Sequence, residues 1–155
     1  KNLTFASPDV GSTNRVREFA SYFNAEMVIC DKQRKRANEI ASMTVIGDVE
    51  GRDIILIDDI CDTAGTLTKS AAMLKERGAL SVTAFCTHPV LSGKAYENIE
   101  NSVLEKLVVC DTIPLKQQCD KIEVVSVAEL FAIAIRNTFE NKSIHSLFIH
   151  SNRLK

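Results

Sequence analysis

The chain has 155 residues, of which 45% are hydrophobic, and its formal net charge is −1, so we expect residues 1–155 to form a single domain with a buried core. The balanced charge excludes a general attraction to nucleic acid or to an anionic membrane. No run reaches the roughly 20 apolar residues that span a bilayer and no signal peptide opens the chain, so we expect a cytoplasmic protein.

Hydrophobic patterning predicts strands that alternate with helices. Short runs of apolar and β-branched residues predict the strands, and apolar side chains spaced three and four residues apart predict the helices. In chain order, the expected strands are residues 3–6, 26–30, 43–46, 54–57, 81–87, 106–110 and 122–125, and the expected helices are residues 13–23, 67–77, 95–101 and 127–139. Such alternation implies an α/β fold with three layers, in which a mostly parallel sheet carries helices on both faces.

The segment from residue 53 to residue 66 is the most informative part of the chain. Residues 54–57 are four β-formers without polar alternation, which is typical of a parallel strand covered on both faces. Asp58 and Asp59 would follow at the carboxyl end of this strand, where open α/β sheets bind ligands. The following residues are Asp62, Thr63, Ala64, Gly65 and Thr66, and they lead into an amphipathic helix.

A helix that starts at this loop would present free backbone N–H groups and its positive dipole end to an anion. Gly65 would let a phosphate approach closely, and Thr63 and Thr66 would add hydroxyl donors. The same residues could instead be ordinary N-caps, turn residues and solvated acids. The apolar strand before the loop and the helix after it favour a sugar-phosphate site.

The most polar stretch is residues 31–41, which include the cations Lys32, Arg34, Lys35 and Arg36. Such a run is usually a solvated surface loop. Here it follows the carboxyl end of a strand, so it should lie at the same edge of the sheet as Asp58. A cationic loop in that position could close over a polyphosphate, with Lys as a point charge and Arg as a bidentate donor.

Other candidate residues support two interpretations each. Asp9 follows the first strand and precedes Gly11, which by itself suggests a turn or N-cap. His88 ends a strand and could contact a ligand or have a structural role. The cysteines are Cys30, Cys61, Cys86, Cys110 and Cys119; they include no C-x-x-C pair, so we expect buried thiols. Cys61 lies in the loop, but no His is near it in sequence to activate it.

Residues 58–66 read Asp-Asp-Ile-Cys-Asp-Thr-Ala-Gly-Thr. This run resembles the phosphoribosyl-diphosphate-binding signature shared by type I phosphoribosyltransferases and ribose-phosphate pyrophosphokinases. The segments that resemble the pyrophosphokinases in particular are residues 7–11, 31–34, 87–93 and 111–114, in the order of that family. The resemblance covers nearly the whole chain and implies a type I phosphoribosyltransferase-like fold. Members of the family are about twice as long, so we expect the carboxyl-terminal half of such an enzyme, with the amino-terminal half missing.

The resemblance also implies a reaction and a set of site residues. Pyrophosphokinases use Mg²⁺ and transfer diphosphate from ATP to O1 of ribose 5-phosphate. Lys32 and Arg34 would be catalytic and Asp9 would bind the metal. The residues implied to bind ribose 5-phosphate are Arg34, Asp58, Asp59, Asp62, Thr63, Ala64, Gly65 and Thr66.

Two departures from the family pattern concern the loops: the family commonly has Gly at the position of Ser12 and Arg at the position of Gln33. The family forms homo-oligomers, as hexamers, and its amino-terminal half supplies much of the ATP site, so we expect this chain to be inactive alone.

Two alternatives remain at this point. A type I phosphoribosyltransferase would use the same phosphate loop to consume the diphosphate, and it would need a hood for a base and a different cationic loop. A regulatory paralogue without activity would keep the fold and lose the chemistry at one of the loops. The Lys32-x-Arg34 pattern and residues 87–93 favour the pyrophosphokinase, and the intact loops argue against the paralogue.

Overall fold

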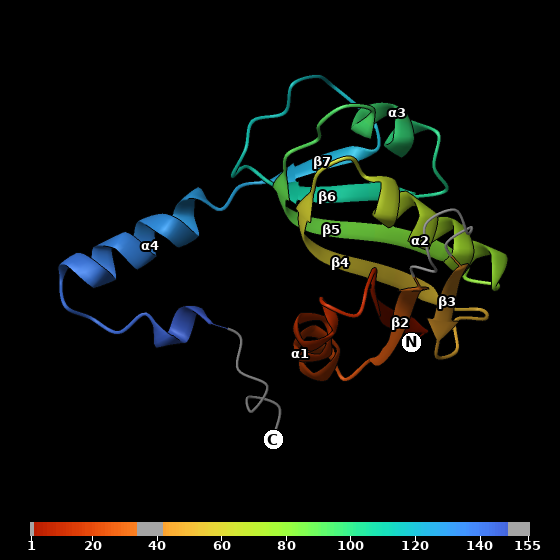
Figure 1. Ribbon diagram of the computed structural model, residues 1–155. Coiled ribbons are helices and arrows are strands. Elements are labelled where there is room, and N and C mark those ends of the chain that lie inside the picture. The colour runs from red at the N-terminus through yellow and green to blue at the C-terminus, as the bar shows by residue number, and fades with distance from the viewer. Residues whose placement is uncertain (1, 34–41, 149–155) are drawn as a thin grey trace.

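In the residues that the structure describes, 2–33 and 42–148 of a computed structural model, seven strands form one sheet (Figure 1). The strands are β1 (Leu3–Ser7), β2 (Glu26–Gln33), β3 (Ser42–Ile46), β4 (Asp53–Cys61), β5 (Ser81–Pro89), β6 (Lys106–Cys110) and β7 (Ile122–Val125). The helices are α1 (Thr13–Phe23), α2 (Gly65–Glu76), α3 (Ala95–Glu100) and α4 (Ala128–Phe139), followed by a 3₁₀ turn at His145–Leu147.

The strand order across the sheet is β3-β2-β1-β4-β5-β6-β7, and every neighbouring pair is parallel except β2 with β3. The expected α/β class with a mostly parallel sheet is therefore confirmed. The order reverses between β1, which pairs with β2 on one side, and β4, which pairs with it on the other. In open α/β sheets, ligands bind outside the carboxyl ends of the strands at this topological switch point.

Helices cover the sheet from both sides, and the side chains of β4 alternate between them. Ile54 and Leu56 pack into the larger core, beneath α2 and α3, while Ile57 packs into the smaller core beneath α1. Leu67, Ala71 and Leu74 of α2 are buried in the larger core, as their spacing predicts. Each large apolar side chain buried in this way contributes roughly 1.5–3 kcal/mol.

β4 and β2 extend three or more residues beyond the carboxyl ends that the pattern of apolar residues predicts. β4 continues to Cys61 because its parallel pairing with β5 continues, with Asp58 opposite Cys86 and Cys61 opposite Pro89. Asp58 and Asp59 therefore lie near the carboxyl end of β4, as predicted, although the strand continues beyond them to Cys61. β2 continues to Gln33 by antiparallel pairing with β3. Backbone pairing does not depend on side-chain polarity, so a strand can continue into a polar sequence.

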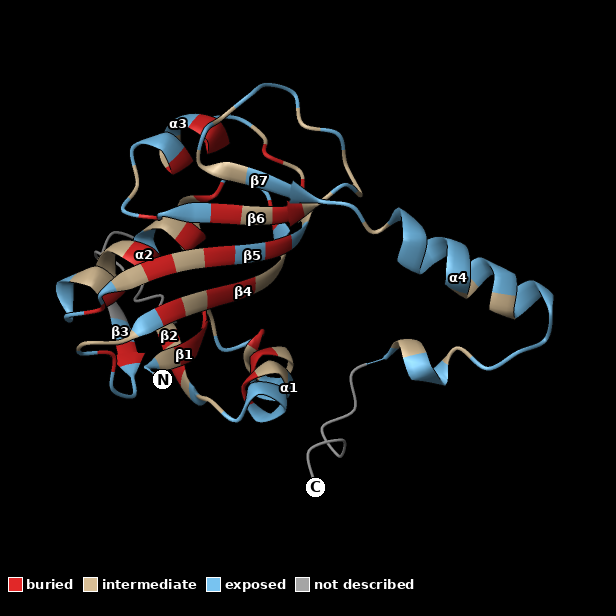
Figure 2. Ribbon diagram, turned by 180° about the vertical axis from the view of Figure 1, so that it is seen from behind, coloured by how far each residue is buried: buried red, intermediate tan, exposed pale blue. Residues whose placement is uncertain are grey.

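The α1 face of the sheet is only partly covered. α1 packs on β1 and β2, and beside it lies an apolar hollow of about 400 Å³, lined in part by Ile55, Phe85 and Val108. α4 forms close to where the sequence predicts a helix, but it extends away from the sheet and covers neither face (Figures 1 and 2).

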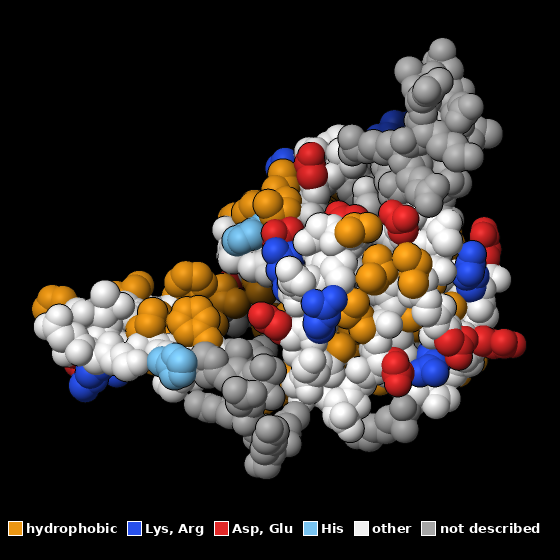
Figure 3. Space-filling model, turned by 60° about the horizontal axis from the view of Figure 1, so that its bottom comes forward, with side chains coloured by type: hydrophobic (Ala, Val, Ile, Leu, Met, Phe, Trp, Pro, Cys, Tyr) orange, Lys and Arg blue, Asp and Glu red, His pale blue; other side chains and the backbone are white. Residues whose placement is uncertain are grey.

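None of the α4 residues is buried, and hydrophobic side chains gather along the helix, at left in Figure 3. The apolar spacing that predicted this helix therefore did not predict packing against the sheet. The expectation that residues 1–155 form one domain stays a prediction. Within the described ranges, no helix combines the length and the apolar character that crossing a bilayer requires.

The environments of α2 and α4 can be compared by replacing one leucine with alanine in each helix. Leu74→Ala should lower the free energy of unfolding by about 2–5 kcal/mol, because Leu74 is 0% exposed and its removal leaves a cavity. Leu130→Ala should cost less than about 1 kcal/mol, because Leu130 is 47% exposed. Urea unfolding of both variants would measure the difference, and equal losses would contradict the exposed position of α4.

Candidate functional site

A polar cavity of about 160 Å³ lies at the switch point, at the carboxyl end of β4 and beside the loop that follows β1. It is lined by Asp9, Asp58 and residues 60–67. The structure thus brings together Asp9, Asp58, Asp62, Thr63, Ala64, Gly65 and Thr66, all of which the sequence predicts as site residues. Asp59 is absent from the lining.

The start of α2 forms one wall of this cavity. Ala64 precedes the helix in the left-handed conformation, with φ 60° and ψ 0°, and no side chain caps the helix. A capping side chain would occupy the first backbone N–H groups, so these groups are available to a ligand. Together with the helix dipole, they favour an anion in this part of the cavity.

Gly65 has a different role from the one that a turn glycine would have. The left-handed residue is Ala64, and Gly65 is not among the residues with positive φ. A Cβ atom placed on Gly65 would meet Thr63 Oγ1 at 3.6 Å, which is an ordinary contact. The protein chain itself therefore tolerates a side chain here, and what the glycine leaves is space beside the free N–H groups.

The segment after β5 supports the phosphate-loop candidate, residues 62–66. The Ser92 hydroxyl donates to the Asp62 carboxylate, and the Ser92 N–H donates to the Asp62 carbonyl at 3.0 Å. Asn98 Nδ2, on α3, donates to the carbonyl of Thr63 at 2.9 Å. The sequence singled out residues 87–93 only by resemblance, and it gave no signal for Asn98. These contacts hold the loop from the segment after β5 and from α3.

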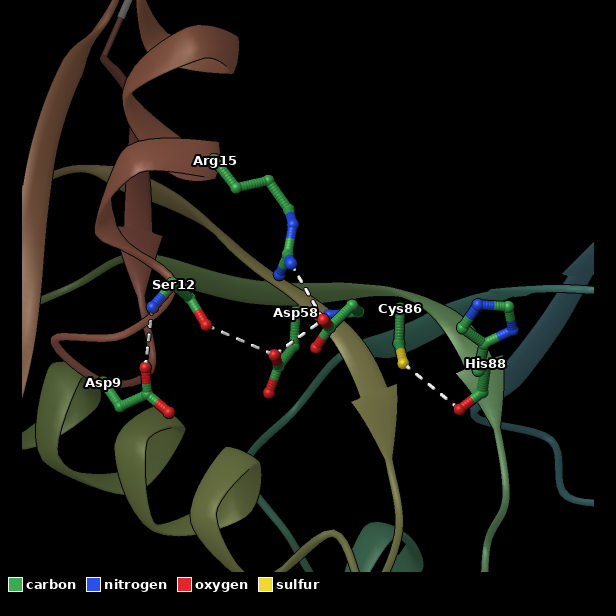
Figure 4. A network of polar contacts seen from close by, with 7 residues as sticks. Asp9, Ser12, Arg15, Asp58, Cys86 and His88 are labelled. Carbon is green, nitrogen blue, oxygen red and sulfur yellow. Dashed lines mark hydrogen bonds and ion pairs between the residues drawn. The ribbon is translucent and has the colours of Figure 1, made fainter.

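Asp9 and Asp58 are both linked to the start of α1 through one residue, Ser12. The Ser12 N–H donates to Asp9 Oδ1 at 2.9 Å, and the Ser12 hydroxyl donates to Asp58 Oδ1 at 3.4 Å (Figure 4). The turn role considered for Asp9 is therefore present, and Asp9 also lines the cavity.

Asp58 and Asp59 experience opposite electrostatic environments. Burial, together with the neighbouring carboxylates of Asp59 and Asp9, raises the pKa of Asp58 to about 6, although the Asp59 N–H donates to its Oδ1 at 2.9 Å. Burial alone would also raise the pKa of Asp59, but the Arg15 guanidinium, 2.8 Å away, lowers it. Asp59 is thus held ionised by a residue of α1.

Arg15 and Ser12 are the site residues that the sequence analysis missed. Both lie at the start of the helix that follows Asp9, three residues apart, so they share one helical face. Polar residues in the first turn of that helix were the available signal. Their partners on β4 lie more than 40 positions away in the chain, beyond the reach of local patterns.

The predicted catalytic residues are only partly described. The backbone of Lys32 lies in β2, opposite Met43 of β3, and its side chain is outside the described part of the structure. Arg34 lies outside the described residues. Their catalytic roles stay predictions.

The contacts of His88 and the burial of Cys61 are typical of structural residues. His88 Nδ1 is 3.0 Å from Thr112 Oγ1, which donates to the carbonyl of Thr87, and His88 does not line the polar cavity. Cys61 is buried, and burial raises the pKa of its thiol to about 11. A thiol with that pKa is protonated at neutral pH, which argues against a nucleophile.

Comparison with known proteins assigns the chain to a family. The model of the phosphoribosyl synthetase-associated domain matches residues 8–149. The chain belongs to this family. It is 54% identical over 149 residues to the ribose-phosphate pyrophosphokinase of Campylobacter jejuni and 52% identical over 148 residues to that of Wolinella succinogenes. Each alignment covers 96% of this chain and 48% of the relative.

The chain is also similar to a solved structure. It matches the crystal structure of phosphoribosylpyrophosphate synthetase from Mycobacterium smegmatis with a TM-score of 0.83 and 31% identity, over 91% of this chain and 46% of that one. The fold expected from the resemblance is thereby confirmed. The chain spans about half the length of the curated relatives it matches. An alignment that covers half of a relative does not by itself say which half is aligned. The expectation that this chain is the carboxyl-terminal half therefore stays a prediction.

The raised pKa of Asp58 predicts a pH-dependent effect of Asp58→Asn. Because the folded-state pKa is above the unfolded value, wild-type stability should fall as pH rises from about 4 through 6, while the amide side chain of the variant stays neutral. The variant should be more stable than wild type at pH 7.5, by about 1–2 kcal/mol after allowance for partial exposure, and equally stable at pH 4.

Urea unfolding across this pH range would measure the effect. Asp59→Asn is the matched control and should have the opposite sign, since it removes the ion pair with Arg15 and should lower stability at neutral pH. A stability advantage of Asp58→Asn that persists at pH 4 would contradict the raised pKa.

Proposed function

We propose that this chain forms the ribose 5-phosphate site of a ribose-phosphate pyrophosphokinase, which transfers the diphosphoryl group of ATP to O1 of ribose 5-phosphate and yields phosphoribosyl diphosphate and AMP. The observation that carries the proposal is the uncapped start of α2, which opens into the cavity that also contains Asp58 and Asp9. An anion-binding helix end and a carboxylate within one cavity suit the phosphate and the hydroxyl groups of a sugar phosphate.

The phosphate would bind to the N–H groups at the start of α2, with the hydroxyls of Thr63 and Thr66 as additional donors. Asp58 would accept hydrogen bonds from the ribose hydroxyls, as its Oδ1 is held by two protein donors and Oδ2 lies outside those bonds. Asp62 is bound to Ser92 through its carboxylate, so it would act by shaping the loop.

Mg²⁺ fits the residues around the cavity. It typically binds to one or two carboxylates together with substrate phosphates, and Asp9 and Asp58 both line the cavity. Among the described residues, no group of three or more His, Cys, Asp or Glu side chains is arranged to hold a metal by itself, which agrees with an ion that is shared with the substrate. When bound, Mg²⁺ would neutralise charge on the phosphate oxygens.

The protein's own contribution would be to position the reactants and to stabilise charge. Lys32 and Arg34 would stabilise the negative charge that develops around the transferred phosphorus. ATP, the second half of the enzyme and further copies of it in an oligomer would be the partners. Relatives with more than half of their aligned residues identical carry the name ribose-phosphate pyrophosphokinase, which favours this reaction over that of a type I phosphoribosyltransferase.

Calorimetry on the 155-residue chain would test the sugar-phosphate site. The chain should bind ribose 5-phosphate and release no AMP from ATP. Gly65→Val should abolish binding of both ribose 5-phosphate and inorganic phosphate, because its side chain fills the space beside the N–H groups. Asp58→Asn should keep phosphate binding and lose about 1–3 kcal/mol of the preference for ribose 5-phosphate over its 2-deoxy analogue. Loss of phosphate by Asp58→Asn with retention by Gly65→Val would contradict these roles, and substantial AMP release would contradict the half-enzyme proposal.

The cationic loop requires an activity measurement in a protein of the relatives' full length that carries residues 1–155. Lys32→Ala and Arg34→Ala should each lower kcat by about a hundredfold or more, with little change in ribose 5-phosphate affinity, because they remove charge stabilisation from the transition state. Gln33→Ala, between them, is the matched control and should have an effect of less than about threefold. A change confined to KM would contradict the catalytic role, and normal activity in all three variants would remove it.

A further inference from the structure

The start of α1 contacts β4 through its N-cap residue, Ser12, and through Arg15 in its first turn. Ser12 Oγ donates to Asp58 Oδ1 at 3.4 Å (Figure 4). Arg15 Nη2 lies 2.8 Å from Asp59 Oδ2. The two acceptors are adjacent in the strand, and the two donors lie one helical turn apart. α1 is thereby fixed to both residues of the acidic pair.

Arg15 also reaches Asp58 indirectly, through Asp59. The Asp59 N–H donates to Asp58 Oδ1 at 2.9 Å, so the backbone of the residue that Arg15 holds is itself a donor to Asp58. Both donors to Asp58 Oδ1, the Ser12 hydroxyl and the Asp59 N–H, therefore belong to segments that the Arg15–Asp59 pair ties together. Their positions determine how the Asp58 carboxylate is turned in the cavity.

The charged residues near Asp58 and Asp59 come from three segments of the chain. Asp9 follows β1, Asp62 follows β4 and Arg15 lies on α1. Arg15 is the cation that contacts the acidic pair in the part of the chain that the structure describes. Its other terminal nitrogen, Nη1, is buried without a hydrogen-bond partner among the described residues. A buried unpaired donor is unfavourable for stability, which suggests that this arginine serves the site.

We propose that Arg15 is a positioning residue of the sugar site: by holding Asp59, it fixes the orientation of the Asp58 carboxylate that accepts hydrogen bonds from the ribose hydroxyls. This inference rests on the proposed ribose 5-phosphate site and assigns Asp59 a role different from direct ligand contact. Asp59 faces Arg15 and is absent from the cavity lining, which supports that distinction.

The test compares the affinity for ribose 5-phosphate with that for its 2-deoxy analogue, measured by calorimetry on the 155-residue chain. Arg15→Met should reduce this ratio about tenfold. Arg15→Lys should restore it to within about threefold of wild type, because lysine supplies the positive charge but not the planar donor geometry of the guanidinium group. Inorganic phosphate affinity should change by less than about twofold in both variants, because the phosphate site at α2 is separate.

Two further variants separate positioning from general effects. Arg17→Met is the matched control: Arg17 lies on the same helix, is exposed and donates to Asn14 of that helix, so its loss should leave the ratio unchanged. Asp59→Asn should reproduce the loss seen in Arg15→Met, and the double variant should be no worse than either, since both changes remove one interaction.

The outcomes distinguish this inference from the proposed function. Wild-type protein that binds no ribose 5-phosphate would overturn the proposed function. Wild-type binding with an unchanged ratio in Arg15→Met would overturn the positioning role alone, and so would an equal loss of ribose 5-phosphate and phosphate affinity. Hydrogen exchange gives a readout without ligand: the Ser12 and Asp59 amides should exchange at least about tenfold faster in Arg15→Met than in Arg17→Met. Equal exchange rates would also overturn the inference.

Discussion

The parallel pairing of β4 with β5 continues to Cys61 and Pro89, and the arrangement of the site depends on this continuation. It keeps Asp58 and Asp59 in an extended backbone, in which successive side chains point to opposite faces. Asp58 therefore lines the polar cavity, and Asp59 faces Arg15 on α1. If the strand ended at Ile57, both carboxylates would belong to a loop, and the backbone would not fix their side chains in opposite directions.

The cavity has two sides with separate supports. On the side of α2, the free N–H groups depend on the loop from Asp62 to Gly65, which Ser92 and Asn98 hold in place. On the carboxylate side, Asp9 and Asp58 depend on Ser12, the N-cap residue of α1. Different elements of the fold thus set the anion-binding part and the carboxylate part of the site, which is why substitutions on one side should leave the other side intact.

Much of the fold could be predicted from the sequence because its elements have strong local patterns. The bounds of α1 agree with the prediction. The pattern of residues 53–66 alone indicated that Asp58 and the loop before α2 would lie at one strand end, and both line the cavity. The end of β4 could not be predicted, because cross-strand pairing determines it and the polar side chains do not oppose it. The contact between Arg15 and Asp59 joins residues 44 positions apart, and the exposed position of α4 depends on packing that its own amphipathic pattern does not encode.

Ala64 shows how the chain prepares the phosphate side before any ligand arrives. A residue with a Cβ atom in the left-handed conformation costs about 1–2 kcal/mol relative to the usual region, and glycine would avoid that cost. Glycine would also give the loop more conformations. The buried methyl group of Ala64 instead restricts the backbone just before the N–H groups of α2. The conformational entropy of this loop is therefore lost when the protein folds, so that less of it remains to oppose binding.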